Sequence, residues 1–356
     1  MTRNVAGLAI LLGAYVLVGC NSIQWTSGHK SPHICSVGIW VPLNYLAGSA
    51  WPLNIPVGGE AESMLHQRMA FRTNPSFAFR PYTVSGLCKE ITRVTGKRIV
   101  WLPEESERLF ARIIEPYLTI PIPGIEHVSK NGMCEYELHD VLCELVSLLT
   151  NVGLNLKLEE ASVWTALVGY DAIFLVKMPL ARGKEGQHVE VPTQVAADQP
   201  CEIWGSVKTV PFVIPENRFT GGITRPDVLS PGALQSRLCM RLSIVPGKYS
   251  FRTLSEELTR VTGDHVVWMP DPKGDKKTLK LFDVQGLVVD VPSESGLPLA
   301  EVLDSLGGLA TELGIAFDSP DREMWSAVIC GDSIMLIMLP GVPERVLGTC
   351  GAVQRD

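Results

Sequence analysis

Cysteine is the residue type with the most evident chemistry in this sequence, which contains nine cysteines in 356 residues. No two of them have Cys-x-x-Cys spacing, and none lies in a histidine cluster with the spacing of zinc ligands. Disulfide formation and burial as thiols are the remaining interpretations. Cys88 and Cys143 can form a disulfide if the two helices predicted below lie side by side; the alternative is two independent buried thiols.

Recognisable catalytic motifs are missing. The sequence has no Gly-x-Ser-x-Gly, His-Glu-x-x-His or Gly-x-Gly-x-x-Gly motif and no complete phosphate-binding loop. His139 adjoins Asp140, and a separate acidic cluster contains Glu104, Glu105 and Glu107. Catalytic carboxylates need a defined separation across a cleft, which sequence neighbours rarely provide, so we interpret both groups as solvated helix ends. We expect no enzyme activity, no catalytic residues, no metal site and no cofactor.

The chain repeats itself. Residues 87–103, LCKEITRVTGKRIVWLP, match 254–270, LSEELTRVTGDHVVWMP, at ten of 17 positions by direct count. A second ungapped match joins 138–179 to 299–340. A duplicated domain is the simplest explanation of both matches.

Six large side chains recur at equivalent positions: Trp101 with Trp268, Trp164 with Trp325, and Arg93 with Arg260. The tryptophans can form a stacking platform for sugars or bases, but we prefer the interpretation that they cap a helix–sheet layer in each copy. Two roles stay open for the arginines. Each can bond the carbonyl groups at its helix end or reach a carboxylate of a neighbouring domain.

Each repeat predicts the same elements. Leu87, Ile91 and Val94 fall on one helical face, followed by Gly96 as a helix end and by a short buried strand. A longer apolar-faced helix and two buried strands come later. We predict an α+β fold with two duplicated domains, each a small mixed sheet with two helices on one face, in the order β-α-β-β-α-β-β.

Three further features belong to the second repeat and its surroundings. Thr253 and Glu256 fit a helix capping box, Gly314 is expected to end the longer helix, and 279–291 has the alternation of strands. The domain boundaries follow from the matches and from the polar, proline-containing stretch between them. We predict a first domain over 35–180, a linker over 181–200, a second domain over 201–342 and a tail over 343–356.

Composition argues against two classes of protein, disordered chains and general nucleic-acid binders. Hydrophobic residues make up 46% and charged residues 19%, which is incompatible with wholesale disorder. The net charge of −7 counts against a general nucleic-acid binder, which needs a basic face. We expect no nucleic-acid partner.

The amino terminus reads MTRNVAGLAILLGAYVLVGC. Its uncharged run from Val5 to Val18 suits a secretory signal and is short for a membrane span, which takes about 20 residues. The ending Leu-Val-Gly-Cys20 resembles the lipobox of bacterial lipoproteins, which implies a signal peptide over 1–19, acylation of Cys20 and a tether over 20–34. Asn21 stands where enteric lipoproteins retained in the inner membrane have aspartate, which implies the periplasmic face of the outer membrane. A plain signal peptide or an uncleaved anchor is the alternative.

The repeated blocks resemble the short amino-terminal (STN) domain of secretins and TonB-dependent receptors and the N domains of secretins. The best match covers 254–340, including LSEELTRVTGDHVVW and the helix LPLAEVLDSLGG; residues 87–179 match more weakly, and 104–137 depart from the pattern. The resemblance implies periplasmic interaction modules. Because no β-barrel or secretin pore region follows, we expect an accessory protein rather than a secretin or a receptor.

The resemblances together imply a lipid-anchored, non-enzymatic interaction or assembly module of a secretion, pilus or TonB-type system. Its expected partners are the membrane, through the lipid, and an envelope protein or a second copy of itself. The alternative is a periplasmic lipoprotein that binds a cell-wall fragment or a peptide in the groove between its domains.

Overall fold

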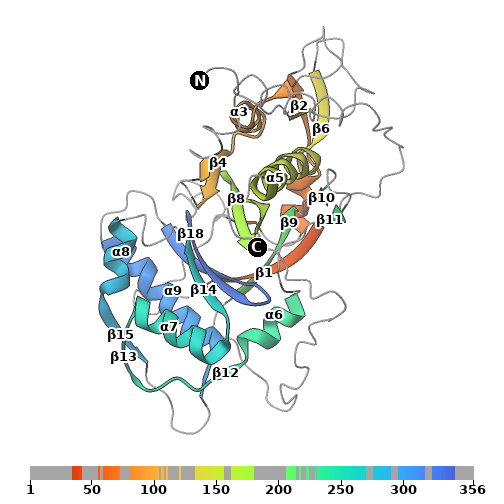
Figure 1. The fold of residues 1–356 in the computed structure, drawn as a ribbon. Helices are drawn as coiled ribbons and strands as arrows, with labels where there is room; N and C mark the ends of the chain where they lie inside the picture. The colour runs from red at the N-terminus through yellow and green to blue at the C-terminus, as the bar shows by residue number, and fades with distance from the viewer. Residues whose placement is uncertain are drawn as a thin grey trace, which may run out of the picture. The chain divides into compact units, whose positions relative to one another are not determined.

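The structure is a computed structural model of the chain (Figure 1). It describes residues 34–41, 55–56, 59–72, 81–103, 106–107, 110, 120–121, 133–155, 162–179, 206–213, 216–217, 222–223, 229, 231–269, 276–289, 296–316 and 323–340. The predicted signal peptide, Cys20, linker and tail lie outside these residues. Helices and sheets are mixed, so the fold is α+β as expected. None of the helices in the described ranges is long and apolar enough to cross a membrane.

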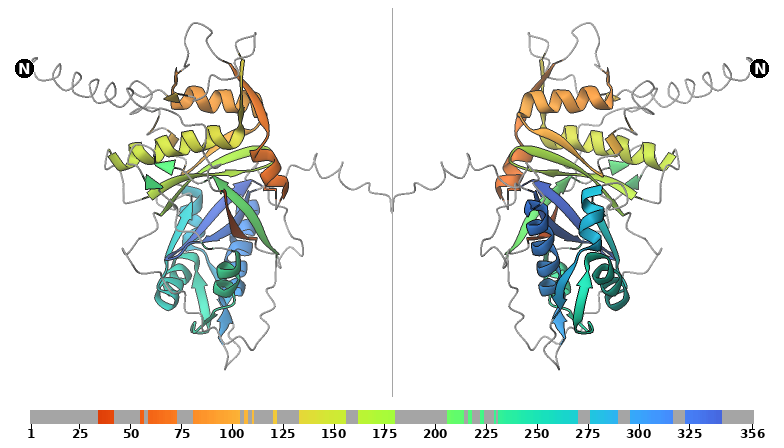
Figure 2. Two further views of the ribbon diagram at one scale, coloured as in Figure 1. Left: turned by 90° about the vertical axis from the view of Figure 1, so that its right-hand side faces the viewer. Right: turned by 90° about the vertical axis from the view of Figure 1, so that its left-hand side faces the viewer.

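The first half of the chain contains the elements expected from the sequence and several short additional ones. They are β1 (Ile34–Val41), α2 (Gly59–Leu65), β2 (Arg68–Arg72), β3 (Pro81–Tyr82), α3 (Val84–Thr95), β4 (Arg98–Leu102), β5 (Ile120–Pro121), β6 (Met133–Glu137), α5 (Leu138–Asn155), β7 (Ser162–Val168) and β8 (Ala172–Pro179). Helices α3 and α5 lie on one face of the strands (Figure 2).

The second half follows a similar order. Its elements are β9 (Ser206–Val213), β10 (Glu216–Asn217), β11 (Gly222–Ile223), α6 (Pro231–Leu238), β12 (Arg241–Leu242), β13 (Gly247–Ser250), α7 (Phe251–Thr262), β14 (His265–Met269), α8 (Lys276–Asp283), β15 (Gln285–Val289), β16 (Leu297–Pro298), α9 (Leu299–Ala316), β17 (Glu323–Ile329) and β18 (Ser333–Pro340).

The expectation of strands from residue 279 onward is wrong in its first part. The segment KKTLKLFD forms α8, and only Gln285–Val289 is a strand. The physical reason is a tertiary contact, because the helix places the Phe282 ring against Trp268 with 4.7 Å between the ring centroids. Alternation over a few residues is a weak signal when a helix can bury the same aromatic side chain.

Helix ends follow local chemistry. Gly96 and Gly263 end α3 and α7 in the left-handed conformation, with φ of 70° and 77°, as the sequence predicts. The capping box of α7 consists of Ser250 and Thr253, so the expected pairing of Thr253 with Glu256 is wrong by one turn. Helix α9 runs two residues past Gly314, to Ala316.

One eight-stranded sheet joins the two halves, in the order β14-β18-β17-β1-β9-β7-β8-β4. Strands β1 and β9 lie at its centre and pair antiparallel along all eight residues. Each then pairs with the other half of the chain: β1 with β17, and β9 with β7. The sequence predicts a separate sheet for each half, and this expectation is wrong. Each half completes its part of the sheet with the first strand of the other half.

Strands β7, β8, β17 and β18 are buried on both faces. On one face, Trp164 and Leu175 pack with α3 and α5, and Trp325 and Leu336 pack in the same way with α7 and α9. The opposite faces of both halves share a third apolar cluster that includes Leu167, Phe174, Val176, Val328, Met335 and Ile337. Burial on both sides explains why AIFLVKM and SIMLIML lack the alternation of a half-exposed strand.

We predict that Phe174→Ala destabilises both halves together. Its side chain is fully buried in the shared cluster, and the loss should be about 3–5 kcal/mol. Hydrogen exchange followed by mass spectrometry in urea reports on β7 and β17 separately, and both should lose protection at the same lowered urea concentration. Val245→Ala, at a position that is 63% exposed, is the control. Loss of protection in β7 alone would contradict the shared core.

Candidate functional site

The eight-stranded sheet ends in β4 and β14, which each have a single strand neighbour in the described part of the chain. Strand β4 runs parallel to β8, and the backbone N–H of Arg98 donates to the carbonyl of Asp171 at 3.0 Å. Backbone groups alternate in direction along a strand, so those of Ile99 and Trp101 point away from β8. An edge of this kind is a template for one more strand.

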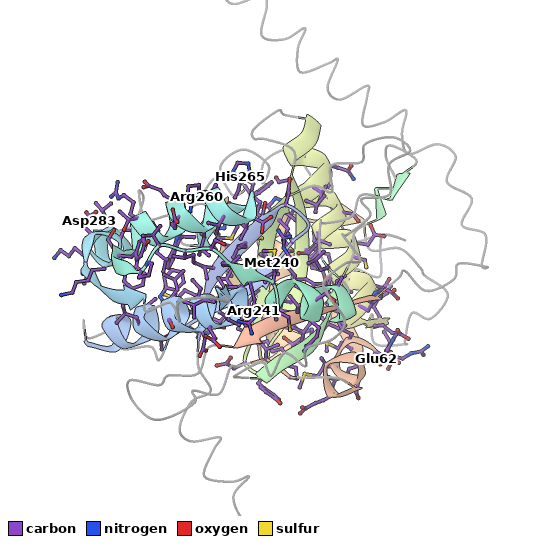
Figure 3. All side chains as sticks on the ribbon, turned by 90° about the horizontal axis from the view of Figure 1, so that it is seen from below. Glu62, Met240, Arg241, Arg260, His265 and Asp283 are labelled. Carbon is purple, nitrogen blue, oxygen red and sulfur yellow. The ribbon has the colours of Figure 1, made fainter. Side chains whose placement is uncertain are left out.

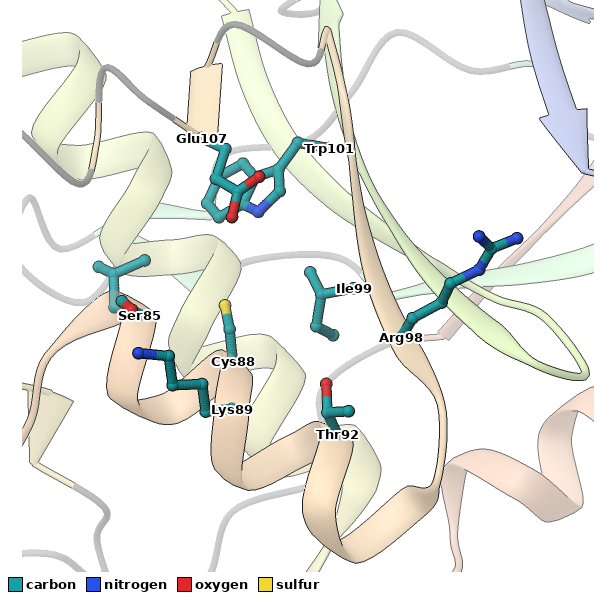
Figure 4. A pocket seen from close by; sticks show the side chains of 9 residues that line it. Ser85, Cys88, Lys89, Thr92, Arg98, Ile99, Trp101 and Glu107 are labelled. Atoms are coloured by element: carbon teal, nitrogen blue, oxygen red, sulfur yellow. The ribbon is translucent and has the colours of Figure 1, made fainter. Parts of the chain in front are cut away.

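A pocket of about 310 Å³ lies beside this edge, between α3 and β4 (Figure 4). The side chains of Cys88 and Ile99 face each other across it, Trp101 and Glu107 lie at one end, and Thr92 lies at the other. The pocket has an apolar floor and a polar rim. Its size is at the lower limit of small-molecule sites, which suits a single side chain.

The equivalent place in the second half is filled by the protein itself. Phe251, the first residue of α7, stands where α3 begins with Val84, and its ring lies 5.8 Å from that of Trp268. Ser255 replaces Cys88, accepts a hydrogen bond from the Trp268 indole at 3.1 Å and donates one to the Phe251 carbonyl at 2.7 Å. Helix α8 adds a third ring next to Trp268.

The four recurrent tryptophans are all buried, which supports the layer-capping interpretation over the stacking platform. Trp101 and Trp164 meet edge to face at 5.5 Å, and Trp268 and Trp325 do so at 4.9 Å. The backbone N–H groups of Trp164 and Trp325 each bond a buried threonine hydroxyl of the long helix of their half, at 2.9 and 3.1 Å. These residues fix α5 and α9 to the sheet.

The recurrent arginines have a role that the sequence analysis missed. Arg93 pairs with Glu90, and Arg260 with Glu257, each three residues earlier on the same helix. The hydrogen bond from Arg260 lowers the pKa of the Glu257 carboxyl. Arg93 also donates to the carbonyl of Ala70 in β2 at 3.2 Å, whereas Arg260 lies at the surface (Figure 3). The Glu-x-x-Arg spacing in both repeats is the signal for this pair.

His139 does not lie at a solvated helix end, so that expectation is wrong. It is 1% exposed and stacks on His66, with 6.1 Å between ring centroids, while its neighbour Asp140 is exposed. Its Nε2 lies 3.7 Å from the sulfur of Cys143, one turn along α5. Both members of this thiol–imidazole pair are buried, which indicates a packing role. Within the described residues no group of histidine, cysteine and acidic side chains could hold a metal ion.

Cys88 and Cys143 are both thiols in the structure, so the disulfide that the sequence allows is not formed here. Cys88 lies half-buried at the pocket, and Cys143 is buried on α5. Of the acidic cluster, Glu107 lines the pocket, and Glu104 and Glu105 lie outside the described residues.

Comparisons with known proteins return no match, whether with protein-family models, with curated proteins or with solved structures. The resemblance to STN and secretin N domains therefore remains a prediction from the sequence blocks.

We predict that Ser255→Ala destabilises the protein by about 1–3 kcal/mol, because it leaves the buried Trp268 indole N–H without its acceptor. Urea unfolding followed by tryptophan fluorescence measures the change. Ser236→Ala, which removes the same hydroxyl from an exposed position of α6, is the matched control and should cost much less. Equal losses in the two variants would contradict a structural role for the Ser255–Trp268 bond.

Proposed function

We propose that the protein is a lipid-anchored envelope lipoprotein whose modules bind another envelope protein, as a non-enzymatic accessory of a secretion, pilus or TonB-type system. The observation that carries this proposal is the edge of β4, which no other strand of the described residues covers, with a pocket beside it. Recognition by strand addition uses those two parts, an edge that supplies main-chain hydrogen bonds and a pocket that selects side chains.

We also propose that the two halves are copies of one module of the STN or secretin N type. Three pairs of features support this. Helices α3 and α7 both span 12 residues and end in a left-handed glycine. Strands β4 and β14 both run parallel to the last strand of their half. The bond from the backbone of Trp164 to a threonine hydroxyl has a counterpart at Trp325.

The cellular address depends on the lipobox resemblance at Cys20. The disulfide bond of Cys239 is consistent with an oxidising compartment outside the cytoplasm. Binding is a better proposal than catalysis because the thiol–imidazole pair that the described residues contain, Cys143 with His139, is buried and out of reach of a substrate.

The alternative function, a periplasmic binder of a peptide or cell-wall fragment, is supported by the same pocket. The pocket lies within the first half, whereas the faces of the sheet opposite the helices are occupied by the apolar cluster that both halves share. A ligand-binding protein of this kind would therefore bind its ligand in the α3–β4 pocket and not in the groove between domains that the sequence leads us to expect.

Lipid anchoring predicts that Cys20→Ser abolishes incorporation of labelled palmitate and releases the protein from the membrane fraction. Asn21→Asp should keep the lipid and move the protein from the outer to the inner membrane. Density-gradient fractionation of the envelope measures both shifts. A Cys20→Ser protein that stays in the membrane fraction would favour an uncleaved anchor.

The interaction function predicts a stoichiometric partner. Crosslinking in intact cells, purification of the tagged, lipidated protein and mass spectrometry should recover a secretin, pilus or receptor component. Recovery of the protein alone would reject the proposal, and recovery with cell-wall fragments would favour the ligand-binding alternative.

A further inference from the structure

We propose that the groove between α3 and the open edge of β4 binds one extended peptide segment of a partner protein, which carries a bulky apolar residue with acidic neighbours. This inference depends on the proposed interaction function and specifies the chemistry of the partner. It assigns the site to the first half alone. Main-chain pairing, the pocket, the surface charges and the contrast with the second half each support one part of it.

Main-chain pairing with β4 requires the bound peptide to be extended. Ile99 and Trp101 direct their backbone groups away from β8, and each residue offers one donor and one acceptor to an added strand. The side chains of these two residues lie on the α3 side of the sheet and line the pocket. Every second side chain of an added strand would point to that same side.

The pocket is the reason to expect a bulky apolar residue in the bound peptide. Its floor is formed by Val84, Cys88, Ile99 and Trp101, and its volume of about 310 Å³ suits one large side chain such as leucine or phenylalanine. Helix α3 forms one wall and β4 the other, so a strand added to β4 would lie along the pocket. A side chain from that strand then enters it directly.

Positive charge beside the groove is the reason to expect acidic residues on either side of the apolar residue of the peptide. Arg98 lines the pocket, and its guanidinium extends from β4 away from the other labelled side chains, as Figure 4 shows. The residues flanking an apolar anchor would point to the side of that guanidinium. Lys89 is an exposed cation on the α3 wall, and Glu107 is the one acidic side chain lining the pocket. At the positions of Lys89 and Arg98 the second half has Glu256 and His265. Two exposed cations beside the groove, Lys89 and Arg98, on a chain of net charge −7 favour an acidic peptide.

The second half shows how the protein can close the same place. Phe251 stands where the first half has the smaller Val84, and its ring packs against Trp268. The ring that α8 adds, Phe282, has a counterpart in Phe110, which stacks on Trp101 at 5.8 Å, so the halves differ at Phe251. Val84→Phe therefore installs in the first half the side chain that the homologous helix already accommodates. It fills the pocket with the smallest change to its surroundings.

The test is selection of a phage library of random 12-residue peptides on the full-length chain, with Val84→Phe and Val245→Phe as the compared variants. Val245→Phe adds the same ring at an exposed site outside the groove. We expect the wild type and Val245→Phe to enrich peptides with leucine or phenylalanine between acidic residues. The enriched peptides, made synthetically, should bind Val84→Phe at least about tenfold more weakly, and Arg98→Glu should remove the acidic preference.

A second measurement does not depend on the folding of any variant. Hydrogen exchange of the wild type with an enriched peptide should increase protection of the Ile99 and Trp101 amides. The groove proposal is overturned if no peptide is enriched, if the enriched peptides bind Val84→Phe equally well, or if protection increases elsewhere and not in β4. In that case a partner recovered by crosslinking leaves the interaction function intact. Conversely, peptides that protect β4 without any crosslinked partner in cells would reject the proposed function and leave the groove established.

Discussion

Burial of β7, β8, β17 and β18 on both faces is the constraint on which the rest of this structure depends. Helices cover one face in each half, and the shared cluster around Phe174 and Ile337 covers the other. Among the described residues, that second face is covered by side chains from both halves. The halves are therefore parts of one folding unit, and the exchanged strands β1 and β9 close the sheet between them. The strands left with an open side are those at the far ends, β4 and β14.

The elements that depend on local chemistry could be predicted from the sequence. The apolar spacing of Leu87, Ile91 and Val94 and the glycine after it correctly indicate α3 and its end. The strand exchange could not be predicted, because β1 has equivalent partners in either half and no residue of the pattern distinguishes them. Helix α8 was missed for a related reason: its conformation depends on the contact between Phe282 and Trp268, which lies outside any local pattern.

The candidate site was only partly visible in the sequence. Recurrence of Trp101 and Trp268 indicates their structural role, because both halves have the same helix–sheet layer. The pocket arises where the halves differ, at Val84 against Phe251 and at Cys88 against Ser255. Its presence depends on how much space each pair of side chains fills, which an alignment of the repeats does not show. Comparing the unmatched positions of a repeat is therefore as informative about binding as comparing the matched ones.

The exchange of first strands also determines when this protein can fold. Ile39 in β1 pairs with Val328 in β17, 289 residues later (328 − 39), so the sheet closes only after nearly the whole chain is available. Such long-range pairing is slow, because the entropy of closing the loop must be overcome before the contacts form. A chain released before residues 323–340 are made therefore lacks β17 and β18, the strands with which β1 and β14 pair. The last two strands complete the sheet of the whole molecule and not of the second half alone.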